Sequence, residues 1–146
     1  MDAAPVIRLV QSPAEFQAAI QVRVIVFVEE QGGPLEDETD AWDPRAEQFV
    51  VLDRERVVGT ARVYEETPGI ARIGRVALLP EYRGRGWGAR LLEAVLEHCR
   101  WRGFPEAELH AQTHACMFYQ RFGFRAVGEE FIEAGIPHRT MRLALV

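Results

Sequence analysis

Three alternating glycines and two arginines lie between an apolar run and a helical pattern, in the stretch RGRGWG at residues 83–88. A strand-to-helix turn leaves the first N–H groups of the helix without intrahelical partners and presents the positive end of the helix dipole. Glycines let an anion approach the main chain, and Arg83 and Arg85 add bidentate donors for phosphate oxygens. Because a tight turn alone needs only one or two glycines, the stretch predicts an anion-binding loop.

Other phosphate-binding motifs fit this loop less well. A P-loop requires Gly-Lys-Ser/Thr, which does not follow. Gly84, Gly86 and Ala89 satisfy the dinucleotide fingerprint G-x-G-x-x-G/A, but residues 80–83 separate the loop from its strand. Too little chain follows Gly88 for a second mononucleotide-binding half. A dinucleotide-binding module remains an alternative, and it predicts NAD(H) binding.

The overall composition fits one globular domain over residues 1–146, with 48% hydrophobic and 27% charged residues. A net charge of −5 argues against a nucleic-acid binder, because such domains usually carry a basic face. The N-terminal stretch lacks a signal-peptide pattern, and no apolar run reaches the ~18 residues of a membrane helix. We therefore expect a cytoplasmic protein without a membrane partner, in which Cys99 and Cys116 are reduced, buried thiols.

Acidic residues gather in the segment 29–47, where Arg45 is the only base. Such a segment either attracts a cationic partner or forms a solvated acidic loop. The acidic side chains are Glu29, Glu30, Glu36, Asp37, Glu38, Asp40, Asp43 and Glu47.

Local patterns predict an alternation of strands and helices. Ser12 and Glu15 form a capping box for a helix that ends at the Gly32–Gly33 pair, although a β-branched run crowds its second half. Apolar residues at helical spacing predict a second helix over residues 86–101, and a shorter helix is expected over 114–122. Strands are expected over 5–10, 48–52, 56–64, 70–79, 106–111, 124–132 and 140–146. This order predicts an α+β domain with a mostly antiparallel sheet and helices on its faces.

Two motifs give the sequence a family resemblance. Residues 83–88 match the pattern Arg/Gln-x-x-Gly-x-Gly/Ala, preceded by the strand RVALLPEY at 75–82. A second motif, N-x-x-A-x-x-F-Y-x-x-x-G-F with glutamine in place of asparagine, is met by Gln112, Ala115, Phe118, Tyr119, Gly123 and Phe124. The sequence therefore resembles the GCN5-related N-acetyltransferase (GNAT) family. Residues 23–31, 109–112 and 135–138 also resemble its ElaA-like branch.

The resemblance implies a fold and a donor site. The expected sheet is mixed, mostly antiparallel and splayed between its fourth and fifth strands, here residues 70–79 and 106–111, with acetyl-CoA held in the gap. Main-chain groups of Val76, Ala77 and Leu78 would pair with the pantetheine arm, and one N–H would polarise the thioester carbonyl. The other expected donor-site residues are Arg83, Gly84, Arg85, Gly86, Trp87, Gly88, Ala89, Gln112 and Phe118.

Acetyl transfer from a thioester to an amine passes through a tetrahedral oxyanion and needs a base for the ammonium and an acid for the departing sulfur. The resemblance makes Tyr119 the expected acid rather than only a core aromatic, since a phenol can protonate a thiolate. Glu30, His110 and His138 are the candidate bases, each with a purely structural alternative. No metal is expected, because His110 and His114 would share a face only within a continuous helix.

The predicted function is an N-acetyltransferase that moves an acetyl group from acetyl-CoA to a primary amine, by direct attack in a ternary complex. The acidic segment favours a small cationic acceptor. A noncatalytic acyl-CoA-binding or sensor domain is the alternative, and it would keep the loop at 83–88 without needing Tyr119 or a base. The resemblance also suggests a homodimer formed through the closing strands.

Overall fold

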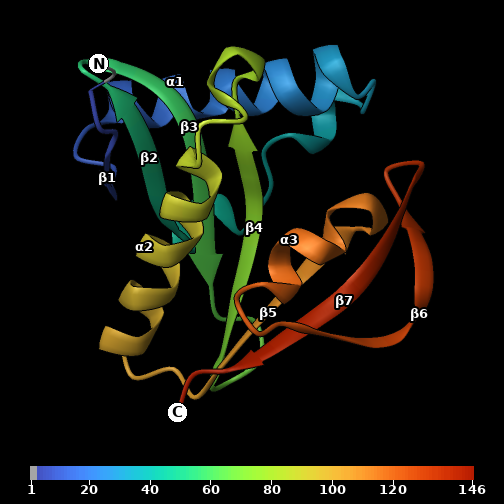
Figure 1. The fold of residues 1–146 in the computed structure, drawn as a ribbon. Coiled ribbons are helices and arrows are strands. Elements are labelled where there is room, and N and C mark those ends of the chain that lie inside the picture. The colour runs from blue at the N-terminus through green and yellow to red at the C-terminus, as the bar shows by residue number, and fades with distance from the viewer. Residues whose placement is uncertain (1–2) are drawn as a thin grey trace.

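The computed structural model describes residues 3–146, which form a seven-stranded sheet in the order β1-β2-β3-β4-β5-β7-β6 (Figure 1). Residues 1–2, the start of the N-terminal stretch considered above, lie outside the described residues. The strands are β1 (Val6–Leu9), β2 (Glu47–Asp53), β3 (Arg56–Tyr64), β4 (Ile70–Leu78), β5 (Glu106–Gln112), β6 (Arg125–Glu133) and β7 (Ile136–Ala144). The α-helices are α1 (Pro13–Arg23), α2 (Trp87–Trp101) and α3 (Cys116–Gln120).

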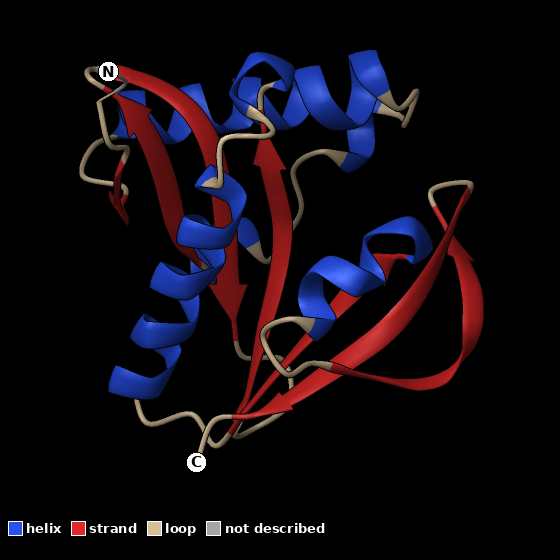
Figure 2. Ribbon diagram, in the orientation of Figure 1, coloured by secondary structure: helices blue, strands red, loops and turns tan. Residues whose placement is uncertain are grey.

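Helices cover both faces of the sheet, as predicted (Figure 2). Ala19 of α1 packs with Val50 and Leu52 of β2, whereas Phe49 meets the His98 ring of α2 edge-on at 5.3 Å. Because successive residues of a strand point to opposite faces, α1 and α2 lie on opposite sides of β2. Among the described residues 3–146, no helix is long and apolar enough to span a membrane.

The first helix begins as the capping box predicts and then changes type. The Ser12 hydroxyl accepts from the Glu15 N–H at 3.1 Å, and the Glu15 carboxylate accepts from the Gln11 N–H at 2.8 Å. After Arg23, the β-branched run Val24–Glu30 forms a π-helix, closed by the Gln31 N–H donating to the Val26 carbonyl at 3.2 Å. The chain is thus helical over the predicted range, but its second half is a π-helix instead of an α-helix. Short π-helical segments are common at functional sites.

The acidic segment is only partly solvated: Glu38 and Asp43 are buried, whereas Glu29, Glu30, Glu36, Asp37 and Asp40 are exposed. It forms two short 3-10 turns, Leu35–Asp37 and Asp43–Arg45, around buried ion pairs. Arg23 donates to Asp43 at 2.9 Å, and Arg62 donates to Asp43 at 2.9 Å and to Asp40 at 2.7 Å. The reading as a solvated loop is therefore wrong for Asp43, which arginines distant in the sequence neutralise.

The splay lies between β4 and β5, which form the only parallel pair in the described sheet. Strand β4 pairs with β5 only from Ile70 with Glu106 to Ile73 with Leu109. Beyond those residues the two strands diverge, as Figure 1 shows. On its other edge β4 stays paired with β3 through a register shift, and Arg75 adopts a left-handed φ of 52° there. The predicted splay between the fourth and fifth strands is confirmed.

The remaining boundaries differ from the predictions only locally. The apolar face of α2 is buried, and Gly103 ends the helix with φ 84° as the Phe104 N–H donates to the Cys99 carbonyl at 3.1 Å. The third helix is shorter than expected and follows a 3-10 turn. Strand β7 begins at Ile136 rather than at residue 140, because Ala134 and Gly135, both with positive φ, close a two-residue hairpin.

Candidate active site

The glycine-arginine loop lies where β4 leads into α2. A 3-10 turn, Pro80–Tyr82, ends the strand, and α2 starts at Trp87. Gly84 and Gly86 have φ of 77° and 79°, which L side chains rarely adopt. A β-carbon on Gly88 would lie 3.6 Å from Leu78 and 3.8 Å from Phe118, so the first turn of α2 sits close to β4 and α3. The loop thus places a helix N-terminus beside the open part of the splay.

Arg83 and Glu30, predicted for separate roles, contact one another. The Arg83 guanidinium donates to the two Glu30 carboxylate oxygens at 2.6 and 2.8 Å, and to the Leu78 carbonyl at 2.9 Å. Hydrogen bonding from Arg83 holds the pKa of Glu30 below its usual range. This pair fastens the end of the π-helix to the loop. Arg85 lies over the rings of Tyr82 and Trp87, at 5.0 and 5.9 Å from their centroids.

The end of β4 presents a strand edge without a strand partner. Ala77 pairs with Thr60 and Leu78 with Gly59 of β3, but β5 has already diverged on the other side. Val76 and Leu78 are half-buried and Ala77 is buried. Main-chain groups on such an edge can pair with an extended ligand, as an added strand would.

Tyr119 and Phe118 lie on α3, on the same side of the sheet as the loop. Tyr119 packs edge-on against Phe118 and Phe124, at centroid distances of 5.1 and 6.0 Å. Burial, with a smaller contribution from Cys116, raises the pKa of Tyr119 to about 12. The phenol therefore keeps its proton at neutral pH and can donate a hydrogen bond, but its raised pKa makes it a weaker acid than an ordinary tyrosine.

Gln112 connects β5 with the π-helix. Its amide donates to the Gln31 side-chain oxygen at 2.9 Å, and its own oxygen contacts the His114 Nε2 atom at 2.7 Å. This contact spans the splay, because Gln31 follows the π-helix and Gln112 ends β5. Within the described residues, no group of three or more His, Cys, Asp and Glu side chains is arranged to hold a metal ion.

His110 and His138 converge on Glu133, a residue that the sequence did not single out. The His110 Nδ1 atom lies 3.0 Å from Glu133 Oε1 and 2.8 Å from an Arg72 nitrogen. The His138 Nε2 atom lies 3.6 Å from Glu133 Oε2. Hydrogen bonding from His110, opposed by burial, gives Glu133 a lowered pKa. The sheet order β5-β7-β6 brings these residues together, which sequence spacing alone could not reveal.

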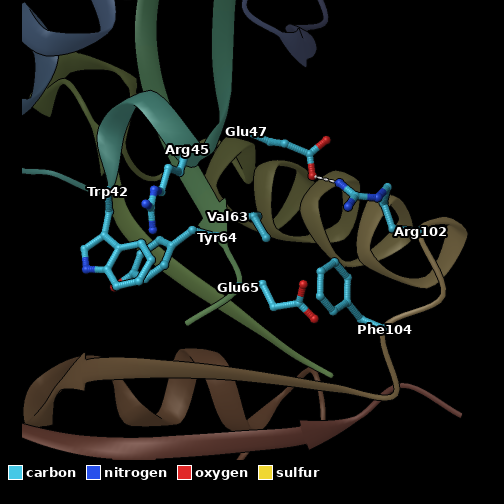
Figure 3. Close-up of a pocket in the computed structure, with 8 residues that line it drawn as sticks. All are labelled: Trp42, Arg45, Glu47, Val63, Tyr64, Glu65, Arg102 and Phe104. Carbon is cyan, nitrogen blue, oxygen red and sulfur yellow. Dashed lines mark hydrogen bonds and ion pairs between the residues drawn. The ribbon is translucent and has the colours of Figure 1, made fainter. Parts of the chain in front are cut away.

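A pocket of about 200 Å³ lies elsewhere, at the C-terminal end of α2 (Figure 3). Its walls include Trp42 stacked on Tyr64 at 4.6 Å, with Glu47 paired to Arg102. Arg102 follows α2 directly, whereas the glycine-arginine loop precedes it. At 1.5 Å per residue, the length of α2 separates this pocket from the loop by roughly 20 Å.

Comparison with known proteins identifies the family. A model described as "Acetyltransferase (GNAT) domain" matches residues 24–145, most of the chain. The chain belongs to the GNAT acetyltransferase family. The splayed pair of strands and the loop at the start of α2 are thus parts of a GNAT domain.

Similar proteins agree with this assignment. The uncharacterized N-acetyltransferase YjcF of Bacillus subtilis is 34% identical over 134 residues, covering 91% of this chain and 95% of YjcF. The crystal structure of Escherichia coli ElaA is 30% identical, with a TM-score of 0.86 over 95% of this chain and 99% of ElaA. An aminoglycoside 6′-N-acetyltransferase complexed with coenzyme A shares the fold at 15% identity, with a TM-score of 0.79 and 97% of each chain covered. The predicted resemblance to GNAT proteins, including ElaA, is confirmed.

The site residues of this GNAT domain fall into two groups on opposite sides of the splay. The loop, the end of β4 and the aromatic side chains of α3 lie together on the α2 side. His110 and His138 lie with Glu133 on the other side, because neighbouring Leu109 and Ala111 point into the core. Glu30 is paired with Arg83 at the loop.

Proposed function

We propose that this GNAT domain transfers an acetyl group from acetyl-CoA to the primary amine of a small cationic acceptor. The observation that carries the proposal is the early end of the β4–β5 pairing, at Ile73 and Leu109, beside the N-terminus of α2. This arrangement offers an open strand edge and an anion-binding helix terminus within one site. Coenzyme A in the related aminoglycoside acetyltransferase structure supports the same donor.

The donor side of the site fits a pyrophosphate joined to an extended arm. Main-chain N–H groups from Gly84 to Ala89 would hold the phosphates, and the Arg85 side chain would add charge. The edge of Val76, Ala77 and Leu78 would pair with the amide-containing arm. The other flanks would be lined by Trp87 and Gly88 of α2, Phe118 of α3 and Gln112 of β5. Arg83, tied to Glu30, would act from the outer end of the loop.

Tyr119 would supply the acid and His110 the base. Tyr119 is protonated at neutral pH, so its hydroxyl can donate a hydrogen bond to the departing thiolate, although its raised pKa makes it a weaker acid than an ordinary phenol. His110 is half-buried, and its Nε2 atom has no hydrogen-bond partner among residues 3–146, whereas His138 is buried with Nδ1 bonded to the Ile136 carbonyl at 2.7 Å. Glu30 is a weaker candidate base, since Arg83 lowers its pKa.

The reaction would proceed by direct attack within a ternary complex. The amine gives one proton to His110 and attacks the thioester carbon, so that a C–N bond forms. The tetrahedral oxyanion is stabilised by a main-chain N–H of β4, and its collapse breaks the C–S bond. The thiolate then takes a proton from Tyr119, and the second proton lost by the acceptor nitrogen restores the phenol. No acyl-enzyme is needed.

Calorimetric titration tests the donor site. Acetyl-CoA, CoA and NADH are titrated into the wild type, into Gly86→Glu and into Gly103→Glu. Gly103 is a matched control, because it has a similar φ of 84° against 79° and equally open surroundings at the opposite end of α2. We expect acetyl-CoA and CoA to bind the wild type and Gly103→Glu, but not Gly86→Glu. Binding of NADH in place of CoA, or equal CoA binding by both variants, would contradict the proposal.

A further inference from the structure

The face of the sheet opposite the donor loop carries a group of polar and aromatic side chains around one carboxylate. Glu133 contacts His110 through Oε1, at 3.0 Å, and approaches His138 through Oε2, at 3.6 Å. Phe131 lies between the histidines, edge-on to His110 at 5.0 Å and stacked with His138 at 6.0 Å. We call Glu133, His110, His138 and Phe131 the hairpin cluster, because all of its members except His110 come from the β6–β7 hairpin.

The strand registers place the hairpin cluster at the mouth of the splay. Leu109 is the last residue of β5 that pairs with β4, and His110 follows it. His138 pairs with Gln112 across β5 and β7, and Phe131 pairs with His138 across β6 and β7. Side chains at paired positions share a face, so the hairpin cluster forms one continuous patch beside the gap between β4 and β5.

Arg72 defines the inner border of this patch. Its guanidinium can only donate, and it reaches the same His110 Nδ1 atom that Glu133 reaches. With Nδ1 protonated, His110 donates to Glu133 and presents an Nε2 lone pair. With Nδ1 unprotonated, Nδ1 accepts from Arg72, and the imidazole proton resides on Nε2. The contacts of Arg72 and Glu133 thus bear on which nitrogen of His110 can accept a proton.

Glu133 is accessible to a ligand, unlike Glu38 and Asp43 of the acidic segment, whose side chains are 5% exposed. Its side chain is 48% exposed, and Oε2 lies beyond hydrogen-bond distance of His138. Its lowered pKa keeps it ionised at neutral pH. An ionised, accessible carboxylate next to an aromatic ring is suited to a protonated amine, which gains an ion pair and a cation–π contact.

We propose that the hairpin cluster is the binding site of the acceptor amine. Glu133 pairs with the ammonium group of the acceptor before His110 takes a proton from that group. The inference rests on the proposed function, since it names the acceptor side of the same splay. It assigns to Glu133 the role of selecting cationic acceptors. The chemical class of ligand is a primary alkylammonium ion.

Proton NMR spectra of the histidine rings test this proposal without knowledge of the natural acceptor. The Cε1–H signals of the four histidines are followed in the full chain at fixed pH and ionic strength. The probes are n-butylammonium, butan-1-ol and butyrate, which differ mainly in charge. His98 and His114 serve as internal controls, because His98 lies on α2 and His114 lies beyond the end of β5. We expect n-butylammonium alone to shift the His110 and His138 signals.

Two variants complete the test. Glu133→Gln should require at least tenfold more n-butylammonium for the same shift. Glu129→Gln removes a charge from an exposed position on the same strand and should respond as the wild type does. Equal responses from the two variants, a larger response to butyrate than to n-butylammonium, or no response of either histidine would each overturn the proposal.

Calorimetry with CoA separates this inference from the proposed function. If CoA binds while the histidines ignore n-butylammonium, the donor site stands and the acceptor binding site is refuted. If the histidines respond as expected but CoA does not bind, the acceptor binding site survives as a cation site and the acetyltransferase proposal fails.

Discussion

Two clusters of ionisable side chains on the same side of the sheet have opposite accessibility. In the sealed cluster, Arg23, Asp43 and Arg62 have side chains that are 0, 5 and 6% exposed. In the hairpin cluster, His110, His138 and Glu133 are 24, 9 and 48% exposed. The sealed cluster uses its charges to fix a loop on the sheet, whereas the hairpin cluster keeps one carboxylate open to a ligand. Accessibility, rather than charge content, separates a structural cluster from a candidate site.

The free-energy cost of burying the Asp43 carboxylate explains why several donors surround it. Burial alone would raise the pKa of Asp43, but hydrogen bonds from Arg23 and Arg62 hold it well below its usual range. Gln48 adds a third donor, at 3.1 Å from the Asp43 carboxylate. A buried charge that loses its partners is strongly destabilising, so the cluster has to remain fully assembled.

The largest effect is expected from Asp43→Asn. This change keeps the shape of the side chain but leaves two buried guanidinium groups with one fewer negative partner. The free energy of unfolding should fall by about 3–5 kcal/mol, measured by urea denaturation. Glu133→Gln is the matched control and should change it by less than ~1 kcal/mol, because its ion pairs are partly exposed. A similar loss from both variants would remove the distinction between the clusters.

The next largest effect is expected from Tyr119→Phe. Removing the phenolic proton donor should lower kcat for acetyl transfer on the order of 100-fold, with little change in CoA affinity. The measurement is steady-state release of free thiol with a primary amine that the wild type accepts, together with calorimetry for CoA. The ring packing against Phe118 and Phe124 does not involve the hydroxyl, so the variant should fold. Full turnover by a folded variant would exclude Tyr119 as the acid.

A smaller effect is expected in how the free energy of unfolding depends on pH under acidic conditions. The pKa of Asp43 is lowered in the folded state, so the unfolded chain takes up a proton first as the pH falls through about 3.9. The stability from Asp43 is complete above that pH and declines below it, towards the lower folded pKa. Between pH 5 and pH 3, the difference in unfolding free energy between wild type and Asp43→Asn should shrink by about 1 kcal/mol. A difference that stays constant or grows would show that Asp43 is not held ionised by its arginines.

Local signals predicted much of the fold. The capping box at Ser12 and the apolar spacing from Trp87 to Cys99 each involve contacts within a few turns, so the sequence specifies them directly. The splay followed from the family resemblance, whereas the glycine-arginine loop was predicted as an anion-binding turn from its own residues. Their geometry depends on where the β4–β5 pairing stops, which spacing does not encode.

Contacts between distant residues escaped prediction. The acidic segment looked solvated because Arg23 and Arg62 lie 15 to 22 residues from the carboxylates that they bind. Glu133 drew no notice because β7 inserts between β5 and β6, a non-sequential order that sets it beside His110. In both regions the decisive partner is a charged residue supplied by another element of the fold.

The smallest effect is expected from the pair that joins Arg83 to Glu30. Its two hydrogen bonds, at 2.6 and 2.8 Å, resemble those of Arg23 and Asp43, yet the side chains are 42 and 38% exposed. Glu30→Gln should therefore change the free energy of unfolding by less than ~1 kcal/mol, and added salt should reduce the difference further. Urea denaturation at low and high salt measures it. A loss as large as that of Asp43→Asn would mean that geometry, and not exposure, decides what an ion pair contributes to stability in this fold.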